Sequence, residues 1–532
     1  MMKRTWKSES AREHVAGCGG WSQPAFIFFS HHPIIPSSHH PVTGAFVILL
    51  TILLTCHSAA DIAEAVPADS LLYAEVGKPA ELWSALQNTE LRQAIRSSLV
   101  TEFILNFTAS TADLFSQSLV NRPLSEAVGR YGLSFGVAFR PGRPGSMPPY
   151  AVILEASENA AELRELLLKN IENTLTARFP NVRVSRERIA GSDVRTFAFS
   201  PKRVWCLAVC KERVIFGGRP AVTWMLKGGD SLASKPGFRA IRADAIALSR
   251  KTFPAGPAIF CYSEISEAAG RGSFLYAQGT QIAGALNVDG ALIRDVSLLR
   301  GPLTIPELGD PKPCTIASAF PRGPFIIHQV SFASDGGLLR FLPMEAADAV
   351  RREGRDADNG LAGVFTGTGF VAISVDGRGP VVAAEVADPS RLDAFLKRLG
   401  LTRNGERWAS PSTTAMTNGH YVYLGAAADV NAIIRALRAP NPGGLDGRQD
   451  LALMLKLLPK LGQGYSLMTP DFLKRIPWAA EFEFIRPAAA GLSPACAQAE
   501  KTGDGLVITS VSPCGYGLWL VSANVDAARN NE

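Results

Sequence analysis

The stretch Asp289-Gly290-Ala291-Leu292-Ile293-Arg294-Asp295-Val296-Ser297 returns near the end of the chain as Asp504-Gly505-Leu506-Val507-Ile508-Thr509-Ser510-Val511-Ser512. Asp, Gly, Ile, Val and Ser coincide at a constant offset of 215 residues. Self-similarity at a fixed spacing indicates that one supersecondary arrangement is built more than once. We therefore expect two similar lobes rather than one large domain.

Three weaker matches occur in the same order along the two halves. A proline-led apolar stretch at 67–76 corresponds to 321–330 at offset 254. A strand, turn, strand and helix then follow in each half at offsets of 234 falling to 230, and the strand at 256–262 matches 463–469 at offset 207. Constant order with drifting offset is what duplication followed by loop deletion leaves.

Strands outnumber helices in this pattern, and most connections resemble hairpins, so the expected fold class is α+β. Each lobe is predicted to be a largely antiparallel sheet with helices packed on one face. The predicted domains are a leader at 1–60, a first lobe at 61–305 and a second lobe at 306–532. Two lobes fit a chain of 532 residues, because domains usually hold about 100–200 residues.

The proline-led apolar strand and the strand-Glu-helix junction, ending at Glu155 and at Glu385, carry a resemblance. In its order of elements the chain resembles a set of uncharacterised exported bacterial proteins with paired α+β lobes. The resemblance covers roughly residues 66–525. It implies an envelope location and no known activity, and it transfers no functional residue.

Composition predicts a folded chain without a nucleic-acid surface. Hydrophobic residues make up 47% and charged residues 19%, with a net charge of +6. Residues 1–60 hold four basic and two acidic residues, so the rest carries only +4. The basic clusters 183–188 and 351–355 are short, and a glutamate interrupts each one. Binding to phosphates needs a concentrated basic stripe, so we expect no nucleic-acid partner.

The leader predicts export. No Asp, Glu, Lys or Arg occurs in 15–60, and residues 45–54 form a ten-residue apolar run broken only by Thr51. This run fits the apolar region of a signal peptide, with small residues for cleavage at 58–60 or 63–65. A retained N-terminal anchor, giving membrane attachment, is the alternative, because 41–60 carries no charge.

Three further features of the leader concern its start, its lipidation and metal binding. Its basic residues lie about thirty residues before the apolar run, which is unusual for a signal, so the true translation start stays open. Cys56 follows a sequence similar to a lipoprotein box, but Thr55 stands where Gly, Ala or Ser is expected, so lipidation is a minor alternative. The His-Pro-rich segment 30–41 lacks the fixed geometry of a metal site.

Cys496 and Cys514 are the candidate disulfide. A hairpin turn at 503–505 places them almost opposite each other on antiparallel strands. Their counterparts at offset 215, Gln281 and Leu299, are both without sulfur. By contrast, Cys206 and Cys210 lie too far apart along one strand to pair, since four residues span about 13 Å.

Few residues suggest catalysis. Six of the eight histidines lie at or before residue 57, leaving His328 and His420; we expect both to be structural and no metal site to form. Ser134 lies in a Gly-x-Ser-x-Gly pattern, but the strand follows the serine, whereas a nucleophile elbow needs it before. Glu155 and Glu385 occupy equivalent strand ends and form an acidic site only if the lobes face each other.

These observations predict a non-catalytic exported envelope protein, binding or structural, with no cofactor. Its partner is expected to be an envelope component or a small amphiphile. One alternative is an amphiphile carrier, in which the apolar helical stretch 91–119 covers a lipid-sized cavity. A second alternative is a hydrolase that uses Ser134 or the Glu155/Glu385 pair.

Overall fold

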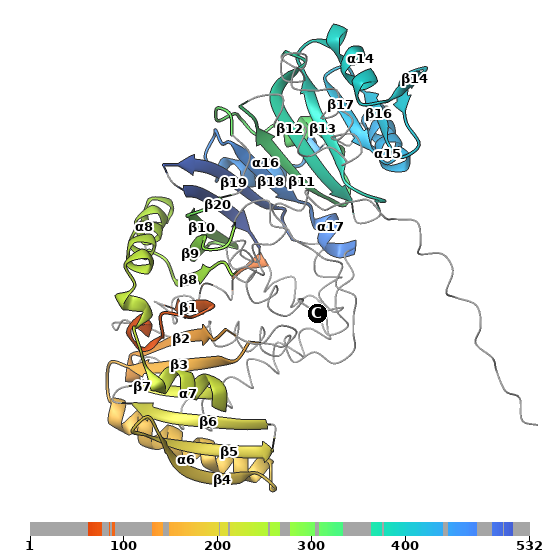
Figure 1. Cartoon of the computed structure of the whole chain (residues 1–532). Helices are drawn as coiled ribbons and strands as arrows, with labels where there is room; N and C mark the ends of the chain where they lie inside the picture. The colour runs from red at the N-terminus through yellow and green to blue at the C-terminus, as the bar shows by residue number, and fades with distance from the viewer. Residues whose placement is uncertain are drawn as a thin grey trace, which may run out of the picture.

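The computed structural model describes 62–76, 85, 88–90, 130–141, 148–201, 203–210, 213–253, 256–266, 277–303, 308–333, 363–374, 377–439, 445–475, 492–503 and 505–513. Twenty antiparallel strands within these residues form a single sheet, which curves into an arc (Figure 1). The α+β class and the antiparallel character of the sheet are confirmed.

Ten strands of the first half lie side by side in the order β4-β5-β6-β7-β3-β2-β1-β8-β9-β10. Their bounds are β1 Leu72–Val76, β2 Leu133–Phe139, β3 Tyr150–Ala156, β4 Arg183–Ile189, β5 Ser192–Ser200, β6 Arg203–Cys210, β7 Arg213–Gly218, β8 Ile259–Glu264, β9 Gln281–Asp289 and β10 Leu292–Arg300. The predicted hairpins at 182–217 and 282–298 are therefore confirmed.

The second half lies in the order β14-β15-β16-β17-β13-β12-β11-β18-β19-β20. Its bounds are β11 Phe325–Ser331, β12 Phe365–Ser374, β13 Val381–Val386, β14 Thr402–Asn404, β15 Arg407–Ala409, β16 Thr414–Thr417, β17 Tyr421–Gly425, β18 Gly464–Met468, β19 Ala495–Thr502 and β20 Gly505–Ser512. Each strand has the same neighbours as the strand ten numbers lower.

The halves join where β10 pairs with β20 along eight residues, which we call the seam. In this register Asp295 lies opposite Ser510. Both are completely buried, and the Ser510 hydroxyl donates a hydrogen bond of 2.5 Å to the Asp295 carboxylate. The sheet is thus continuous across the seam and ends at β4 on one side and β14 on the other.

Helices cover both faces of the sheet, so the expectation of helices on one face is wrong. On one face α6 (Ala160–Arg178) and α14 (Pro389–Arg398) pack in a core that includes residues of both halves. On the other face α7 (Arg219–Lys227) and α8 (Pro236–Thr252) cover the first half, while α15 (Ala427–Leu437) and α16 (Gln449–Lys456) cover the second.

Helices cover both faces because the central strands carry apolar side chains on both faces. Successive side chains of a strand point to opposite faces, and central strands such as β11 are buried at every position. Both apolar faces must then be covered.

Short helices complete the fold: η1 Ile62–Ala65, η2 Leu232–Ser234, α10 Ile316–Ala319, η3 Leu445–Gly447 and α17 Pro470–Arg475.

Local signals explain where the helices begin. A proline in the first turn opens α7, α8 and α14, where its missing N–H costs nothing. At α14 the Asp388 carboxylate also accepts the backbone N–H of Ser390 at 2.9 Å. The closing hairpins turn at Gly290 and Gly503, whose φ angles of 62° and 55° favour glycine.

Candidate functional site

Each half carries a cleft bounded by equivalent elements. The cleft of the first half, about 1310 Å³, lies among η1, the end of β3, α6, the β4–β5 and β6–β7 hairpins and the end of α7. The cleft of the second half, about 690 Å³, lies among α10, α14, the β14–β15 and β16–β17 hairpins and the end of α15. We call them the first and second clefts.

A carboxylate-guanidinium cluster lies in the first cleft. Glu155 is the penultimate residue of β3, with its side chain 4% exposed, and Arg213 of the neighbouring β7 contacts it at 3.0 Å. Glu64 from η1 lies 3.5 Å from the same guanidinium. The register explains the contact, because Glu155 and Arg213 are directly opposite each other. A buried carboxylate needs such a partner, since desolvation of an unpaired charge is costly.

Further ion pairs hold the β4–β5 hairpin against the helices around the first cleft. Arg195 donates to the Leu168 carbonyl of α6 at 2.7 Å and also pairs with Glu172. On the opposite face Glu187 pairs with Arg219 of α7 at 2.7 Å. The walls of the cleft are therefore fixed by charged contacts between a hairpin and two helices.

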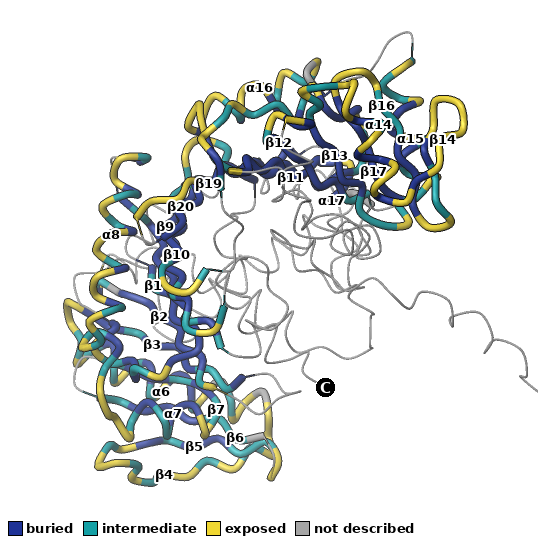
Figure 2. The backbone as a smooth tube through the Cα atoms, turned by 45° about the horizontal axis from the view of Figure 1, so that its top comes forward, coloured by how far each residue is buried: buried dark blue, intermediate teal, exposed yellow. Residues whose placement is uncertain are grey.

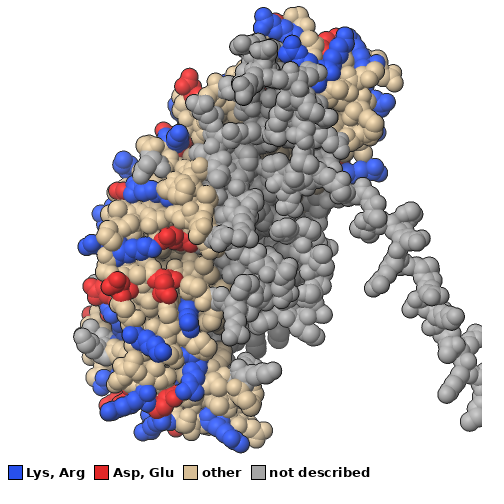
Figure 3. Space-filling model, in the orientation of Figure 1, with Lys and Arg blue, Asp and Glu red and all other residues tan. Residues whose placement is uncertain are grey.

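Two cations of the first cleft are available to a ligand. Arg164 on α6 and Arg186 on β4 both line it. Among the described residues neither guanidinium has a hydrogen bond or an ion pair. On the face shown in Figure 3, basic and acidic side chains of the first half are interspersed. This first cleft suits a polar ligand with a localised anionic group.

The second cleft has a different lining. Leu392, Leu396, Trp408, Met416 and Val422 supply apolar side chains from α14 and the hairpins. Charged side chains join them in two ion pairs, Arg403–Asp393 at 2.9 Å and Arg438–Glu406 at 2.8 Å. The Arg403 guanidinium also lies 5.7 Å from the Trp408 ring centre, within the range of a cation-π contact. This second cleft suits an apolar group with a polar end.

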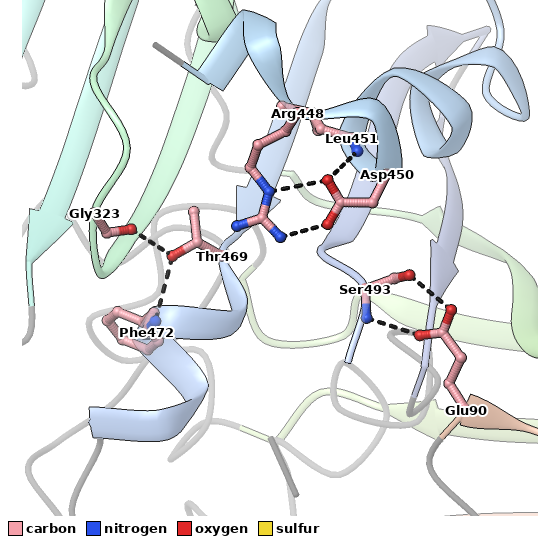
Figure 4. Close-up of polar contacts among 8 residues, drawn as sticks. All are labelled: Glu90, Gly323, Arg448, Asp450, Leu451, Thr469, Phe472 and Ser493. Atoms are coloured by element: carbon pink, nitrogen blue, oxygen red, sulfur yellow. Dashed lines mark hydrogen bonds and ion pairs between the residues drawn. The ribbon is translucent and has the colours of Figure 1, made fainter. Parts of the chain in front are cut away.

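Polar contacts near the seam join the two halves (Figure 4). The Glu90 carboxylate accepts the backbone N–H and the hydroxyl of Ser493, both at 2.7 Å, while its own N–H donates to the Ala291 carbonyl at 2.8 Å. Close by, Arg448 and Asp450 form a two-point ion pair. The hydrogen bonds from Arg448 hold the pKa of Asp450 below its usual value. The Glu90–Ser493 contact strengthens the junction, the Arg448–Asp450 pair lies within the second half, and none of these residues lines either cleft.

The predicted catalytic residues lie in separate places. Ser134 on β2 is 1% exposed and lies opposite Glu155 in the register, outside the lining of either cleft. Glu385 on β13 is half-buried and accepts the Thr366 hydroxyl at 2.5 Å. Ten strands separate β3 from β13, roughly 50 Å along the sheet. Glu155 and Glu385 therefore do not form a shared acidic site.

The two histidines outside the leader differ sharply. His328 on β11 is 2% exposed, and its Nδ1 shares a hydrogen bond of 2.9 Å with the Ser466 hydroxyl on β18. Burial lowers the pKa of His328 to about 3, which keeps the ring neutral. His420 is exposed in the β16–β17 turn, where its N–H donates to the Asn418 side chain at 3.1 Å. Neither histidine lines a cleft among the described residues.

The His328–Ser466 contact could not be read from the sequence. The two residues lie 138 positions apart, and only the pairing of β11 with β18 makes them neighbours. A histidine inside an apolar strand was the one available signal that a polar partner must exist, because buried polar groups are normally hydrogen-bonded.

The candidate disulfide stays a prediction. Cys496 is 2% exposed and lies opposite Val511, three residues before Cys514 in the sequence. Cys514 lies outside the described residues. Comparing peptide masses before and after reduction decides the question, since a disulfide adds two hydrogens on reduction. Cys206 and Cys210 lie on β6, as expected, with Cys206 completely buried and Cys210 half-buried.

Several predicted features lie outside the described residues. They are the apolar run 45–54, the His-Pro-rich segment 30–41, Cys56, the cleavage site at 58–60 and the helical stretch 91–119. The alternative cleavage site at 63–65 lies in η1, where Ala63 is buried. Within the described ranges, no helix is both long and apolar enough to cross a membrane. The same part of the chain contains no cluster of three or more His, Cys, Asp or Glu suited to a metal ion.

Comparisons of the chain with protein-family models, with curated proteins and with solved structures found no match.

Proposed function

We propose that this chain is a non-catalytic binding protein of the cell envelope, built from two duplicated α+β lobes that share one sheet. One observation carries the proposal: the two halves hold clefts bounded by equivalent elements, one rich in charged side chains and one that combines apolar side chains with two ion pairs. Duplication followed by divergence of the lining residues produces two related sites with different ligand preferences.

The strand register supports duplication. Tyr73 lies opposite Ala138 in the first half, and Ile327 lies opposite Ala372 in the second. Tyr73 and Ile327 are 254 residues apart, and Ala138 and Ala372 are 234 residues apart. These are the same offsets as in the sequence repeat. Two independently arising sheets have no reason to agree in both neighbours and register.

The condition of the candidate catalytic groups supports a non-catalytic role. A hydrolytic serine needs a base that can accept its proton near neutral pH. The serine-histidine contact between Ser466 and His328 is buried, and the pKa of His328 is lowered to about 3. Such a ring is a poor base, and the buried pair offers no exposed hydroxyl to a substrate.

Export and envelope location follow from the leader alone. They are tested by separating cells into fractions and comparing the full chain with a variant in which charged residues interrupt 45–54. The proposal predicts that the full chain reaches the envelope and that the variant stays in the cytoplasm. Equal distribution of the two proteins contradicts the proposed location.

Ligand binding is tested by recovering the native protein from its cell fraction and identifying co-purifying molecules by mass spectrometry. Two double variants assign a molecule to a cleft: Arg164→Ala with Arg186→Ala, and Leu396→Ser with Trp408→Ala. A molecule lost from one variant and retained by the other supports binding in that cleft. A serine labelled by a fluorophosphonate probe in the native protein supports the hydrolase instead.

A carrier of amphiphiles is the second candidate, and the second cleft favours it. Ligand sites are mostly apolar, with a few polar groups that fix orientation, and the second cleft combines an apolar lining with two ion pairs. The expected result is that a fluorescent acyl amphiphile binds the native chain and loses affinity in Trp408→Ala. If Trp408→Ala binds the amphiphile with unchanged affinity, the carrier function is ruled out.

A further inference from the structure

Three exposed leucines lie four residues apart in sequence along α16 and the segment that follows it. Leu453, Leu457 and Leu461 are 62%, 40% and 54% exposed. A spacing of four residues places Leu453 and Leu457 on the same side of the helix, and Figure 2 shows the outer side of α16 as exposed. We call these three residues the leucine ridge.

The leucine ridge does not attach α16 to the sheet. Leu451, Met454 and Leu458 on the inner side do so and are buried in the core of the second half. In the first half α8 occupies the equivalent place, and its outer side carries Arg239 and Ala243, both exposed. Because α8 packs without outer leucines, the fold does not require the leucine ridge.

The segment that carries the leucine ridge holds two positive charges. An ion pair also contacts this segment, because Arg294 donates to the Leu457 carbonyl at 3.3 Å and pairs with Asp289 at 2.9 Å. Lys456 and Lys460 are exposed between the leucines, and neither has an ion pair or a hydrogen-bonded side chain among the described residues. No Asp or Glu occurs in 451–461. The nearest carboxylate in the sequence, Asp450, is already paired with Arg448. Large apolar side chains beside unpaired lysines are typical of helices that lie on anionic membrane surfaces.

We propose that the leucine ridge, with Lys456 and Lys460, docks the protein on an anionic lipid surface. The leucines enter the boundary between headgroups and acyl chains, and the two ammonium groups contact lipid phosphates. A symmetric contact between two copies is disfavoured, because it brings four lysines together with no carboxylate on the segment to balance them. This attachment is independent of the two clefts and of the leader.

The test is co-sedimentation of the full chain with vesicles of phosphatidylcholine, or of phosphatidylcholine mixed with phosphatidylglycerol. We expect binding to the mixed vesicles to fall at least tenfold in the triple variant Leu453→Ser, Leu457→Ser, Leu461→Ser. The double variant Lys456→Gln, Lys460→Gln is expected to lose between about 5-fold and 30-fold, because each lysine near an anionic surface contributes about fivefold. That loss should be absent on phosphatidylcholine alone.

Matched controls separate the leucine ridge from other causes. Phe179→Ser removes an apolar side chain that is 42% exposed on another part of the surface, and we expect it to bind like the native chain. The leader is present in every protein, so its contribution cancels. All variants alter exposed side chains and should unfold at the native temperature, which is checked by circular dichroism.

The inference is overturned if the triple leucine variant binds the mixed vesicles as strongly as the native chain does. It is also overturned by self-association of the native chain that the leucine variant abolishes while vesicle binding persists, because the leucine ridge then serves a second copy. The cleft variants described above should keep native vesicle binding. Failure of ligand binding in a cleft is therefore distinguishable from failure of membrane docking.

Discussion

Asp295 and Ser510, which occupy the same position in the two matching stretches, face each other across the seam and share a hydrogen bond of 2.5 Å. When a residue on one antiparallel strand faces its own counterpart on the other, a local twofold axis passes between them. The antiparallel pairing of the two matching stretches is therefore centred on this buried contact.

Replacing Ser510 by Ala should lower the free energy of unfolding by about 1–3 kcal/mol, because the buried Asp295 carboxylate loses a donor. The measurement is urea unfolding followed by circular dichroism. Ser297→Ala is the matched control, since Ser297 is also completely buried on β10 and its hydroxyl has no hydrogen-bond partner among the described residues. Equal losses in the two variants contradict a specific role for the Asp295–Ser510 contact.

Arg213→Ala should destabilise the protein by about 2–3 kcal/mol, because it leaves the buried Glu155 carboxylate without its guanidinium partner. This lies below the ~3–5 kcal/mol of a fully buried pair, since the Arg213 side chain is 22% exposed. Arg188→Ala is the control. It breaks an ion pair with Asp193 whose side chains are 78% and 85% exposed, and such pairs contribute about 0–1 kcal/mol. Similar losses in both variants argue against the prediction.

His328 should make the protein less stable in acid. Burial lowers its pKa to about 3 in the folded chain, whereas the unfolded chain takes up the proton below about pH 6.5. Between these values the unfolded state binds more protons, so stability is present above pH 6.5 and is lost as the pH falls. The loss from this group approaches ~1.4 kcal/mol per pH unit.

His328→Gln removes that contribution while keeping a polar group beside Ser466. Urea unfolding at several pH values between 7 and 4 should show a shallower dependence for this variant than for the native chain. His420→Gln, which changes an exposed side chain in a turn, should keep the native dependence. Parallel curves for the native chain and His328→Gln would mean that the buried ring does not govern the acid response.

Cys261 should resist alkylation in the native protein. It is 1% exposed on β8, and burial, followed by the charge of nearby Asp295, raises the pKa of its thiol. The reactive species is the thiolate, so iodoacetamide at pH 8 should leave this residue unmodified until urea is added. Peptide mapping measures the modification, with the half-buried Cys210 as the internal comparison. Labelling of Cys261 before Cys210 without urea contradicts the prediction.

Local patterns were enough to place most elements. The predicted helices at 160–175 and 389–399 appear as α6 and α14, and the predicted closing hairpins appear as β9–β10 and β19–β20. These features depend on leucine spacing, first-turn prolines and glycine turns, all of which are short-range. Positions separated by the repeat offsets also pair alike: Tyr73 lies opposite Ala138, and Ile327 lies opposite Ala372.

Features that depend on tertiary packing were not predictable in the same way. The repeat gave no indication that β10 and β20 would pair, and so two separate sheets were as consistent with it as one. Helices were expected on one face because the apolar alternation was assigned to a single core. The cleft-lining pair Glu155 and Arg213 was missed because 58 residues separate its members and only the β3–β7 pairing brings them together.

The Asp295–Ser510 contact at the seam favours keeping the two halves in one polypeptide. If two free copies of the first half associated through β10, each Asp295 would meet another Asp295 at a buried position, and two carboxylates at that distance resist simultaneous ionisation. Joining unequal halves substitutes a hydroxyl for one of the acids, so the contact becomes complementary. Tethering thus permits a junction that identical subunits could form only by holding a proton between them.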